Sequence, residues 1–126
     1  MSRSVLVVEE NEDLGGLYAS ILKAEGYSVE VCRDSDVAIQ RSGERDYAAV
    51  LVEASPVAGF RPLIDFLSAN RLDSLQSVVL ATTDSDSSLD AEWASKGVFE
   101  LLHKPLTRDR LRISIKGCTA HHNREK

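Results

Sequence analysis

Runs of apolar residues alternate along this chain with segments in which apolar residues recur every three or four positions. Two of the runs, residues 5–8 and 47–52, are continuous and apolar, as is typical of strands buried on both faces of a parallel sheet, whereas residues 27–31 alternate between apolar and polar. The strands that this pattern predicts are residues 5–8, 27–31, 47–52, 77–81 and 98–102. A helical pattern follows each strand, over residues 14–22, 35–44, 63–67, 84–96 and 107–118.

Glycine and small polar residues mark the ends of the first two helices. Gly26 lies just past the last turn of the first helix, and Asp34 or Ser35 can cap the second. Gly15 and Gly16 lie inside the first helix. Each costs about 1 kcal/mol relative to alanine, so the first turn of this helix is predicted to be weak.

The alternation of strands and helices predicts a parallel sheet with right-handed crossovers and with helices on both faces. This is an α/β, doubly wound, three-layer sandwich, and the strand order 2-1-3-4-5 suits five strands. That order makes the first and third strands neighbours. Glu9 and Glu10 follow the first strand and Glu53 ends the third. We therefore expect the three carboxylates to meet at the sheet edge where ligands bind in this class of fold.

The composition is that of an ordinary globular domain. The chain has 126 residues, of which 43% are hydrophobic and 28% charged, and this length allows a hydrophobic core. We expect a single domain over residues 1–120, followed by a short C-terminal tail, residues 121–126. His121 and His122 are predicted to be tail residues without core contacts, in a segment that frays.

Charge, cysteine usage and hydropathy argue against several functions. Fifteen Lys and Arg residues against twenty Asp and Glu give a net charge of -5, which argues against nucleic-acid binding through phosphates. Cys32 and Cys118 have neither metal-ligand spacing nor the density of a disulfide scaffold, so free thiols are predicted. No segment approaches the roughly 20 apolar residues of a membrane span. A cytoplasmic protein without membrane attachment is expected.

Three carboxylates in one pocket repel each other and need a proton or a cation. Lys104, which follows the fifth strand, is one candidate counter-charge, and Mg²⁺, a cation that prefers oxygen ligands, is the other. The same acids exclude a flavin mononucleotide site, because they would repel its phosphate.

These positions together resemble the receiver domain of two-component response regulators, over essentially all of residues 3–119. The family has an acidic pair after the first strand, an Asp phosphoacceptor ending the third, a Thr or Ser after the fourth and Lys-Pro after the fifth. Here Glu9 and Glu10 take the place of the pair, Glu53 that of the acceptor and Thr82 that of the hydroxyl, and Lys104-Pro105 matches the last motif. The resemblance implies the flavodoxin-like (CheY-like) fold, a role in phosphorelay signalling and a Mg²⁺ pocket formed by Glu9, Glu10 and Glu53.

The chain departs from the family pattern at the positions that carry the chemistry. The resemblance implies Asp at the acceptor and at one position of the acidic pair, whereas Glu stands at 53 and at 10. One added methylene moves each carboxylate by roughly 1.5 Å, while Mg²⁺ requires near-octahedral ligands at about 2.0–2.1 Å. Because phosphoryl transfer depends on positioning, conventional Asp phosphorylation is not expected.

Two further departures affect the loop and the relay beside the acceptor. Pro56 follows Glu53 by three residues where the family usually has four. Leu101 stands where many receivers carry an aromatic residue whose rotation reports phosphorylation. Phe99 shares a face with Leu101 by strand alternation and is the candidate replacement. The chain is therefore predicted to differ from the family both in how it receives a phosphoryl group and in how it passes the signal on.

Three functions are compatible with these residues. In the first, the chain is an atypical receiver, or pseudo-receiver, that binds protein partners, with Glu53 reaching Lys104 or Thr82 as an acyl phosphate would. In the second, Glu53 accepts phosphate from a histidine kinase with Mg²⁺. In the third, the acids support metal-assisted hydrolysis, which the lack of a His or Cys base and of a second Lys or Arg in the site loops disfavours. We therefore expect no enzymatic activity.

The expected partners are proteins: a histidine kinase, a phosphotransfer protein or a downstream signalling protein. A monomer or a weak homodimer is expected, and the sequence leaves open whether the chain is complete or part of a longer protein.

Trp93 is predicted to be a packing anchor. The last helix carries basic residues that ordinarily form a solvated face and that could, with acids of the preceding helix, form a partner surface: Arg108, Arg110, Arg112 and Lys116, with Asp84, Asp86, Asp90 and Glu92.

Overall fold

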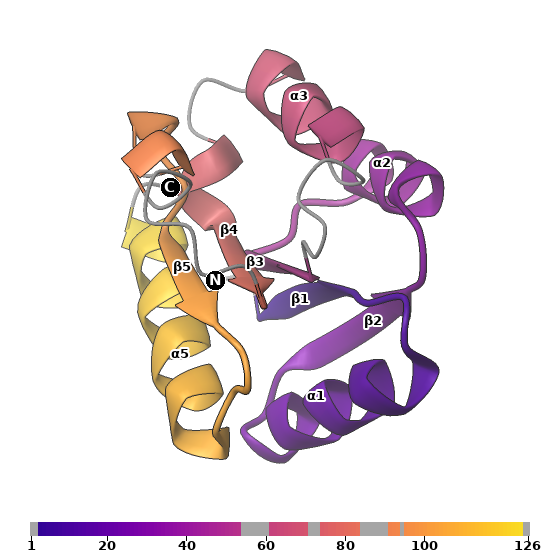
Figure 1. The fold of residues 1–126 in the computed structure, drawn as a ribbon, viewed down its shortest axis with the longest axis vertical. Coiled ribbons are helices and arrows are strands. Elements are labelled where there is room, and N and C mark those ends of the chain that lie inside the picture. Colours follow the sequence, from indigo (N-terminus) through magenta and orange to yellow (C-terminus); the bar gives the residue numbers. More distant parts are fainter. Residues whose placement is uncertain (1–2, 54–60, 71–73, 84–90, 94, 125–126) are drawn as a thin grey trace.

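The computed structural model describes residues 3–53, 61–70, 74–83, 91–93 and 95–124. Its centre is a five-stranded parallel sheet in the order β2-β1-β3-β4-β5 (Figure 1). The strands are β1 (Ser4–Val8), β2 (Ser28–Cys32), β3 (Ala49–Glu53), β4 (Val78–Thr82) and β5 (Glu100–His103). The predicted fold class and strand order are confirmed, with strand ends displaced by one or two residues.

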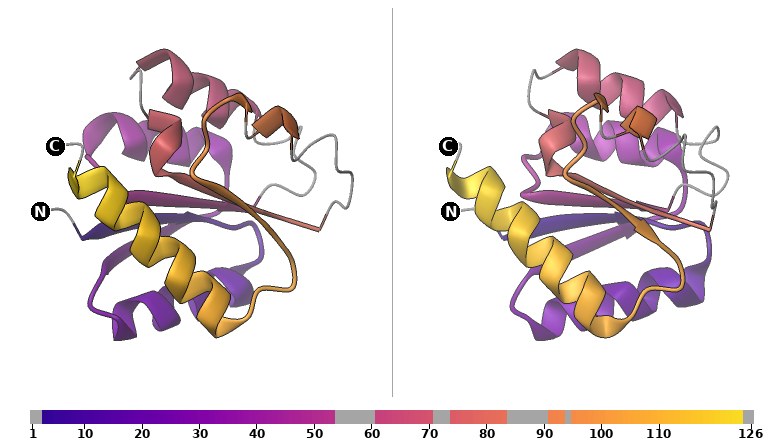
Figure 2. Two further views of the ribbon diagram at one scale, coloured as in Figure 1. Left: turned by 90° about the vertical axis from the view of Figure 1, so that its left-hand side faces the viewer. Right: turned by 60° about the vertical axis from the view of Figure 1, so that its left-hand side comes forward.

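Helices cover both faces of the sheet and form the two outer layers (Figure 2). On one face lie α1 (Glu12–Ala24) and α5 (Arg108–Arg124), and on the other α2 (Ser35–Glu44) and α3 (Arg61–Asn70). A short 3-10 helix, η2 (Ser74–Ser77), leads into β4, and residues 91–93 and 95 are helical. Pro56, in the loop beside the acceptor position, and the first half of the helix predicted over 84–96 lie outside the described residues.

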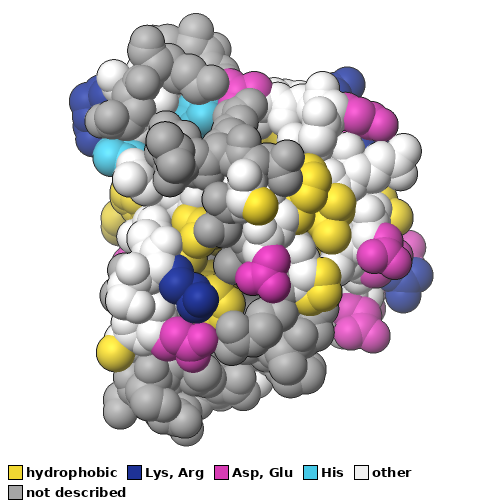
Figure 3. Space-filling view, turned by 90° about the horizontal axis from the view of Figure 1, so that it is seen from above, with side chains coloured by type: hydrophobic (Ala, Val, Ile, Leu, Met, Phe, Trp, Pro, Cys, Tyr) yellow, Lys and Arg dark blue, Asp and Glu magenta, His cyan; other side chains and the backbone are white. Residues whose placement is uncertain are grey.

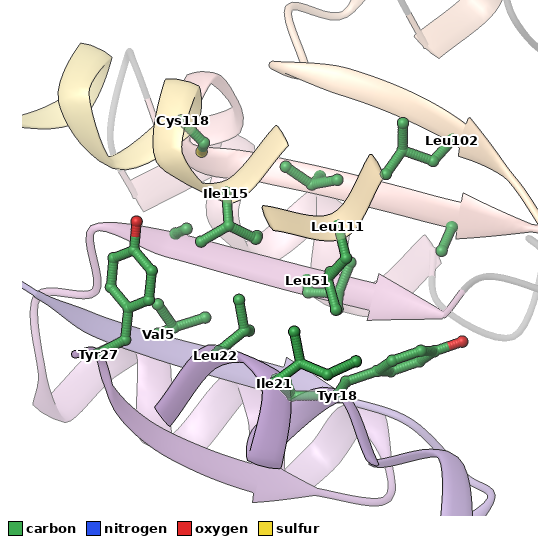
Figure 4. Close-up of a cluster of buried hydrophobic side chains, with 14 residues drawn as sticks. Val5, Tyr18, Ile21, Leu22, Tyr27, Leu51, Leu102, Leu111, Ile115 and Cys118 are labelled. Carbon is green, nitrogen blue, oxygen red and sulfur yellow. The ribbon is translucent and has the colours of Figure 1, made fainter. Parts of the chain in front are cut away.

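Each face of the sheet buries its own apolar cluster, because successive strand residues point to opposite faces. Leu6 and Val8 of β1 pack toward the α2–α3 side, in a cluster that includes Trp93, the predicted anchor. Val5 and Val7 pack toward α1 and α5. Figure 4 shows this second cluster filled from α1, α5 and the sheet. The continuous apolar runs of the sequence thus mark strands that are covered on both sides.

Asn11 and Gly26 mark the two ends of α1, and of these only Gly26 was predicted from the sequence. Asn11 caps the helix by accepting a hydrogen bond from the Leu14 N–H at 3.0 Å. Gly26 has a φ of 94°, a left-handed conformation that glycine adopts without steric cost. Within the helix, a Cβ on Gly15 would lie 3.0 Å from the Val31 Cγ1 atom. Glycine at this position therefore lets α1 approach β2 closely.

The structure corrects the expected C-terminal tail. α5 continues to Arg124, and His122 is buried. Its Nδ1 atom lies 2.8 Å from the Ser77 Oγ, and its Nε2 atom 3.3 Å from the Asp46 Oδ2. The apolar spacing of the sequence stops at Cys118, and the last turn is held by polar contacts that such spacing does not reveal.

The prediction that Phe99 and Leu101 share a face of the sheet is wrong. Phe99 packs with the cluster beneath α1 and α5, whereas Leu101 packs with the cluster on the α2–α3 side. β5 begins only at Glu100, so Phe99 precedes the regular alternation of the strand.

The two cysteines lie inside the protein, and charged side chains are found on its outer surface. Cys32 and Cys118 are free and buried. No helix in the described ranges is long and apolar enough to cross a membrane. On the face in Figure 3, acidic, basic and apolar side chains are interspersed over the part of the surface that is described.

Candidate functional site

The carboxyl ends of four neighbouring strands bring the predicted site residues together. Glu9 directly follows β1, and its N–H donates to the Cys32 carbonyl oxygen at 3.0 Å. Glu53 ends β3 and Thr82 ends β4. Lys104 follows β5, and its N–H donates to the Thr82 carbonyl oxygen at 2.8 Å. Parallel pairing therefore fixes all four backbones at one edge of the sheet, as the strand order predicted.

Lys104 joins two of the carboxylates. Its Nζ atom lies 3.1 Å from the Glu9 Oε1 and 3.8 Å from the Glu53 Oε1. The Lys104 side chain is 12% exposed, and those of Glu9 and Glu53 are 3% and 10% exposed. Lys104, one of the two counter-charges that the sequence allowed, thus contacts both buried carboxylates.

Glu9 is held on both of its carboxylate oxygens. Oε1 accepts a hydrogen bond from Lys104, and Oε2 accepts one from the Asn11 N–H at 3.2 Å. A Cβ on Gly15 would lie 3.6 Å from the Glu9 Cβ, so the first turn of α1 also packs on the stem of this side chain. Glu9 is thus positioned by β1, α1 and the residue after β5.

The electrostatic environment keeps Lys104 charged. Burial alone would lower its pKa, but the hydrogen bond to Glu9 and the charge of Glu53, followed by Tyr18 and the charge of Glu9, together outweigh burial and raise the pKa. Because the folded-state pKa is raised, the stabilising contribution of the ammonium is complete below about pH 10.4. It is lost only as the pH rises through the folded-state pKa.

Tyr18 is a neighbour of the site that sequence reasoning assigned only to the core. The Lys104 Nζ lies 5.9 Å from the centroid of its ring, and Figure 4 shows its hydroxyl pointing out of the apolar cluster, at the end opposite Tyr27. Burial raises the pKa of Tyr18, Lys104 partly offsets this, and the charge of Glu9 raises it further. Helical spacing marks such a residue as buried and cannot show where its hydroxyl points.

Glu10 does not join the other two acids as expected. It is exposed, and its carbonyl oxygen accepts a hydrogen bond from the Arg33 Nε at 3.3 Å. Within the described part of the chain, no three His, Cys, Asp or Glu residues are grouped so that they could hold a metal ion. β1 ends at Val8 and Glu10 lies in a bend, so the alternation of the strand does not determine the direction of its side chain.

A hollow of 380 Å³ adjoins the site. Leu14, Leu17 and Tyr18 of α1 line one side, and Lys104 and Leu106 line the other. Leu17, predicted as part of the apolar stripe of α1, is 52% exposed here. The lysine that neutralises the acids is therefore accessible from an open apolar groove.

No known family profile matches the chain. Among curated proteins, the nitrogen assimilation regulatory protein NtrX of Azorhizobium caulinodans is 26% identical over 115 residues, which cover 88% of this chain and 25% of NtrX. The chain spans about a quarter of the length of the curated relatives it matches.

Solved structures extend this likeness to the whole fold. The signal receiver domain of a Vibrio parahaemolyticus protein superposes with a TM-score of 0.89 at 25% identity, over 99% of this chain and 95% of that domain. The beryllofluoride-activated NtrC4 receiver domain dimer gives a TM-score of 0.85 at 25% identity, over 95% of this chain and 98% of that one. Fold and sequence together support a response-regulator receiver domain with the CheY-like fold. Within that class, the chain is similar in sequence to regulators of the NtrX type.

Proposed function

We propose that this domain is an atypical receiver of two-component signalling that binds protein partners without conventional Asp phosphorylation. One observation supports it above all: the carboxylate at the acceptor position belongs to Glu53, is buried, and lies 3.8 Å from the Lys104 ammonium. In the family, as the resemblance implies, this lysine contacts the phosphorylated acceptor. The Glu53 carboxylate therefore places a negative charge near Lys104 without any phosphorylation. The domain is in this proposal a signalling module and not an enzyme.

The same geometry supports permanent mimicry of the phosphorylated state. Glutamate carries its charge one methylene further from the backbone than aspartate, in the direction an acyl phosphate would extend. Lys104 also binds Glu9 at 3.1 Å, so the ammonium is shared between the acids that follow β1 and end β3. The proposal is that this pairing holds the domain in one signalling state, which its protein partners recognise.

A functional phosphotransfer receiver is the second candidate, and the position of Glu53 at the end of β3 favours it. A Glu53 carboxylate oxygen would attack the phosphorus of a phosphohistidine, forming an O–P bond as the N–P bond breaks, and Lys104 would stabilise the added charge. The resemblance implies Mg²⁺ for this chemistry, with Glu9, Glu10 and Glu53 as its ligands. The donor set does not fit well, since Glu10 is exposed and the Lys104 ammonium contacts both of the other two acids.

The partners proposed are a histidine kinase, a phosphotransfer protein or a downstream signalling protein. The NtrC4 receiver, a relative in fold, is a dimer in its beryllofluoride-activated form. For the present domain we propose a monomer or a weak homodimer.

The test is an intact-mass measurement after incubation with Mg²⁺ and acetyl phosphate, on the natural protein, Glu53→Asp and Glu53→Gln. We expect no phosphoryl adduct on the natural protein. An adduct on Glu53→Asp alone would show that the pocket can act once the acceptor is shortened. A stoichiometric adduct on the natural protein that Glu53→Gln abolishes would establish the second candidate and overturn the first.

A further inference from the structure

A second hollow, of 340 Å³, lies at the end of the molecule opposite the candidate site. Arg3 and Tyr27, which line it, immediately precede β1 and β2, whereas Glu9 and Glu53 stand at the strand ends. A strand of five residues spans about 16 Å. The hollow is therefore separate from the site around Lys104 and lies beneath α5, which supplies its other wall.

Arg3 brings a fixed positive charge to this hollow. Its Nε donates to the Gly26 carbonyl oxygen at 3.2 Å, and its Nη2 donates to the Glu25 carbonyl oxygen at 3.0 Å. The guanidinium also lies 4.6 Å from the centroid of the Tyr27 ring. These contacts orient the group through backbone oxygens and an aromatic face, and no carboxylate among the described residues neutralises it.

Arg112 and Lys116 add two cations from successive turns of α5. Arg112 is held by ion pairs of 2.8 Å with both Glu25 and Asp109. The Lys116 ammonium has no ion pair within the described ranges. Three cations and one carboxylate, Glu25, line the hollow, and Asp109 pairs with Arg112 beside it, so these five side chains carry one net positive charge in a chain whose net charge is -5. A concave surface of one sign focuses its field and concentrates ions of the opposite sign.

Below the cations the floor of the hollow is polar and closed. The Tyr27 hydroxyl lies 3.4 Å from the Thr119 Oγ1, and that oxygen also donates to the Lys116 carbonyl oxygen at 3.2 Å. In Figure 4 the Tyr27 hydroxyl points from the sheet toward α5. Both hydroxyls thus have partners inside the protein, so the contacts proposed for a ligand rest on the cations of the lining.

We propose that this hollow binds a small phosphate monoester, with the dianionic phosphate held by Arg3, Arg112 and Lys116. The net positive charge of these side chains attracts such a group, and guanidinium groups suit phosphate oxygens because they present parallel N–H donors. The volume exceeds that of a phosphate ion and lies in the range of small-molecule pockets, so it leaves room for an organic substituent. The site is independent of the function proposed for Glu53 and Lys104.

The test is an NMR titration of the whole chain with inorganic phosphate, adenosine 5′-monophosphate and adenosine at constant ionic strength. We expect saturable shifts of the backbone amides of Tyr27, Lys116 and Thr119 with both phosphates, and no such shifts with adenosine. Lys116→Gln and Arg3→Gln should each weaken the binding of the monophosphate at least fivefold. Arg3→Lys, which keeps the charge but loses the guanidinium, should weaken it less.

Lys96→Gln is the matched control, because it removes one positive charge from a side chain that lies over the Trp93 ring, outside the hollow. It should leave the affinity unchanged. An equal loss of affinity in Lys96→Gln would mean that only the overall charge attracts phosphate, and would overturn the proposal. So would the absence of saturable shifts, or shifts confined to the amides around Glu9 and Thr82, which would place the phosphate at the other end of the sheet.

Discussion

A single ammonium group contacts two buried carboxylates in the candidate site. Lys104 contacts Glu9 and Glu53, and the second oxygen of Glu9 is satisfied by the Asn11 N–H. A buried ion pair stabilises a protein only when good geometry and additional hydrogen bonds offset the loss of hydration. The charge balance of this site therefore depends on Lys104 more than on either acid.

We expect Lys104→Met to lower the free energy of unfolding by about 3–5 kcal/mol at pH 8, because it leaves buried carboxylates without a counter-charge. The destabilisation should become smaller as the pH falls toward 5, because protonation removes the charge of the uncompensated carboxylates. Urea unfolding of the variant and the natural protein at pH 8 and pH 5 measures both effects.

The double variant Lys104→Met with Glu53→Gln is the control for this charge argument. It should recover part of the lost stability at pH 8, since one of the two uncompensated charges is gone. Equal urea midpoints for Lys104→Met and the natural protein at pH 8 would contradict the argument.

Residue positions in the site could be predicted where the backbone alone determines them. Glu9, Glu53, Thr82 and Lys104 follow apolar strands, and parallel pairing places such positions at one sheet edge. The direction of a side chain could not be predicted in this way. Glu10 was expected to face inward and is exposed, and whether lysine or metal balances the acids depends on distances that sequence spacing does not contain.

At the scale of elements, apolar periodicity identifies the strands and helices but not all of their ends. α5 was expected to lose contact with the core after Cys118, yet it continues for six more residues to Arg124. His122 anchors that turn through Ser77 and Asp46. A histidine near a chain end carries no periodic signal, so only the fold, which brings the start of β4 beneath α5, reveals its partner.

The two glycines of α1 provide a matched test of helix propensity against packing. A Cβ on Gly16 would have no atom within 4 Å, whereas a Cβ on Gly15 would lie 3.0 Å from the Val31 Cγ1. We expect Gly16→Ala to raise the free energy of unfolding by about 0.5–1 kcal/mol, as alanine does in an open helix position. Gly15→Ala should gain nothing or lose stability, because α1 must move away from β2. Thermal and urea unfolding of both variants compare the two effects.

Shortening the opposing side chain distinguishes crowding from propensity. In the background Val31→Ala, the alanine at position 15 no longer meets the Val31 Cγ1, and Gly15→Ala should then stabilise by nearly as much as Gly16→Ala. Equal gains from the two substitutions in the natural background would mean that Gly15 is not required for the close approach of α1 to β2.

At the scale of the whole molecule, α5 connects the outer layer to the amino ends of the central strands. Cys118 is fully buried on this helix, with its Sγ atom 3.9 Å from the Ala48 carbonyl oxygen and 4.0 Å from that of Gln76. Burial, with a further contribution from the charge of Glu100, raises the pKa of this thiol to about 12. The folded protein thus keeps Cys118 neutral at a pH where the unfolded chain ionises it.

This difference predicts that alkaline pH weakens the fold through Cys118. A folded-state pKa raised above the unfolded value contributes stability that is complete below about pH 8.5, the unfolded thiol pKa, and that is lost as the pH rises toward 12. Between pH 8 and pH 10.5 the loss from this one thiol is on the order of 2 kcal/mol. Urea unfolding under reducing conditions should show the natural protein losing more stability over this range than Cys118→Ala, by about that amount.

Cys118→Ala also removes packing contacts, but the resulting loss of stability does not depend on pH. The pH dependence of the difference in unfolding free energy between the natural protein and the variant therefore reports the ionisation of the thiol alone. Cys32→Ala is the comparison within the same chain, because burial raises the pKa of Cys32 only to about 11, and the resulting difference should level off at lower pH. The ionisation of tyrosines and of Lys104 in this range is common to both proteins and cancels. Parallel curves for the natural protein and Cys118→Ala would mean that the thiol is not protected by burial and that the end of α5 opens to solvent before the sheet unfolds.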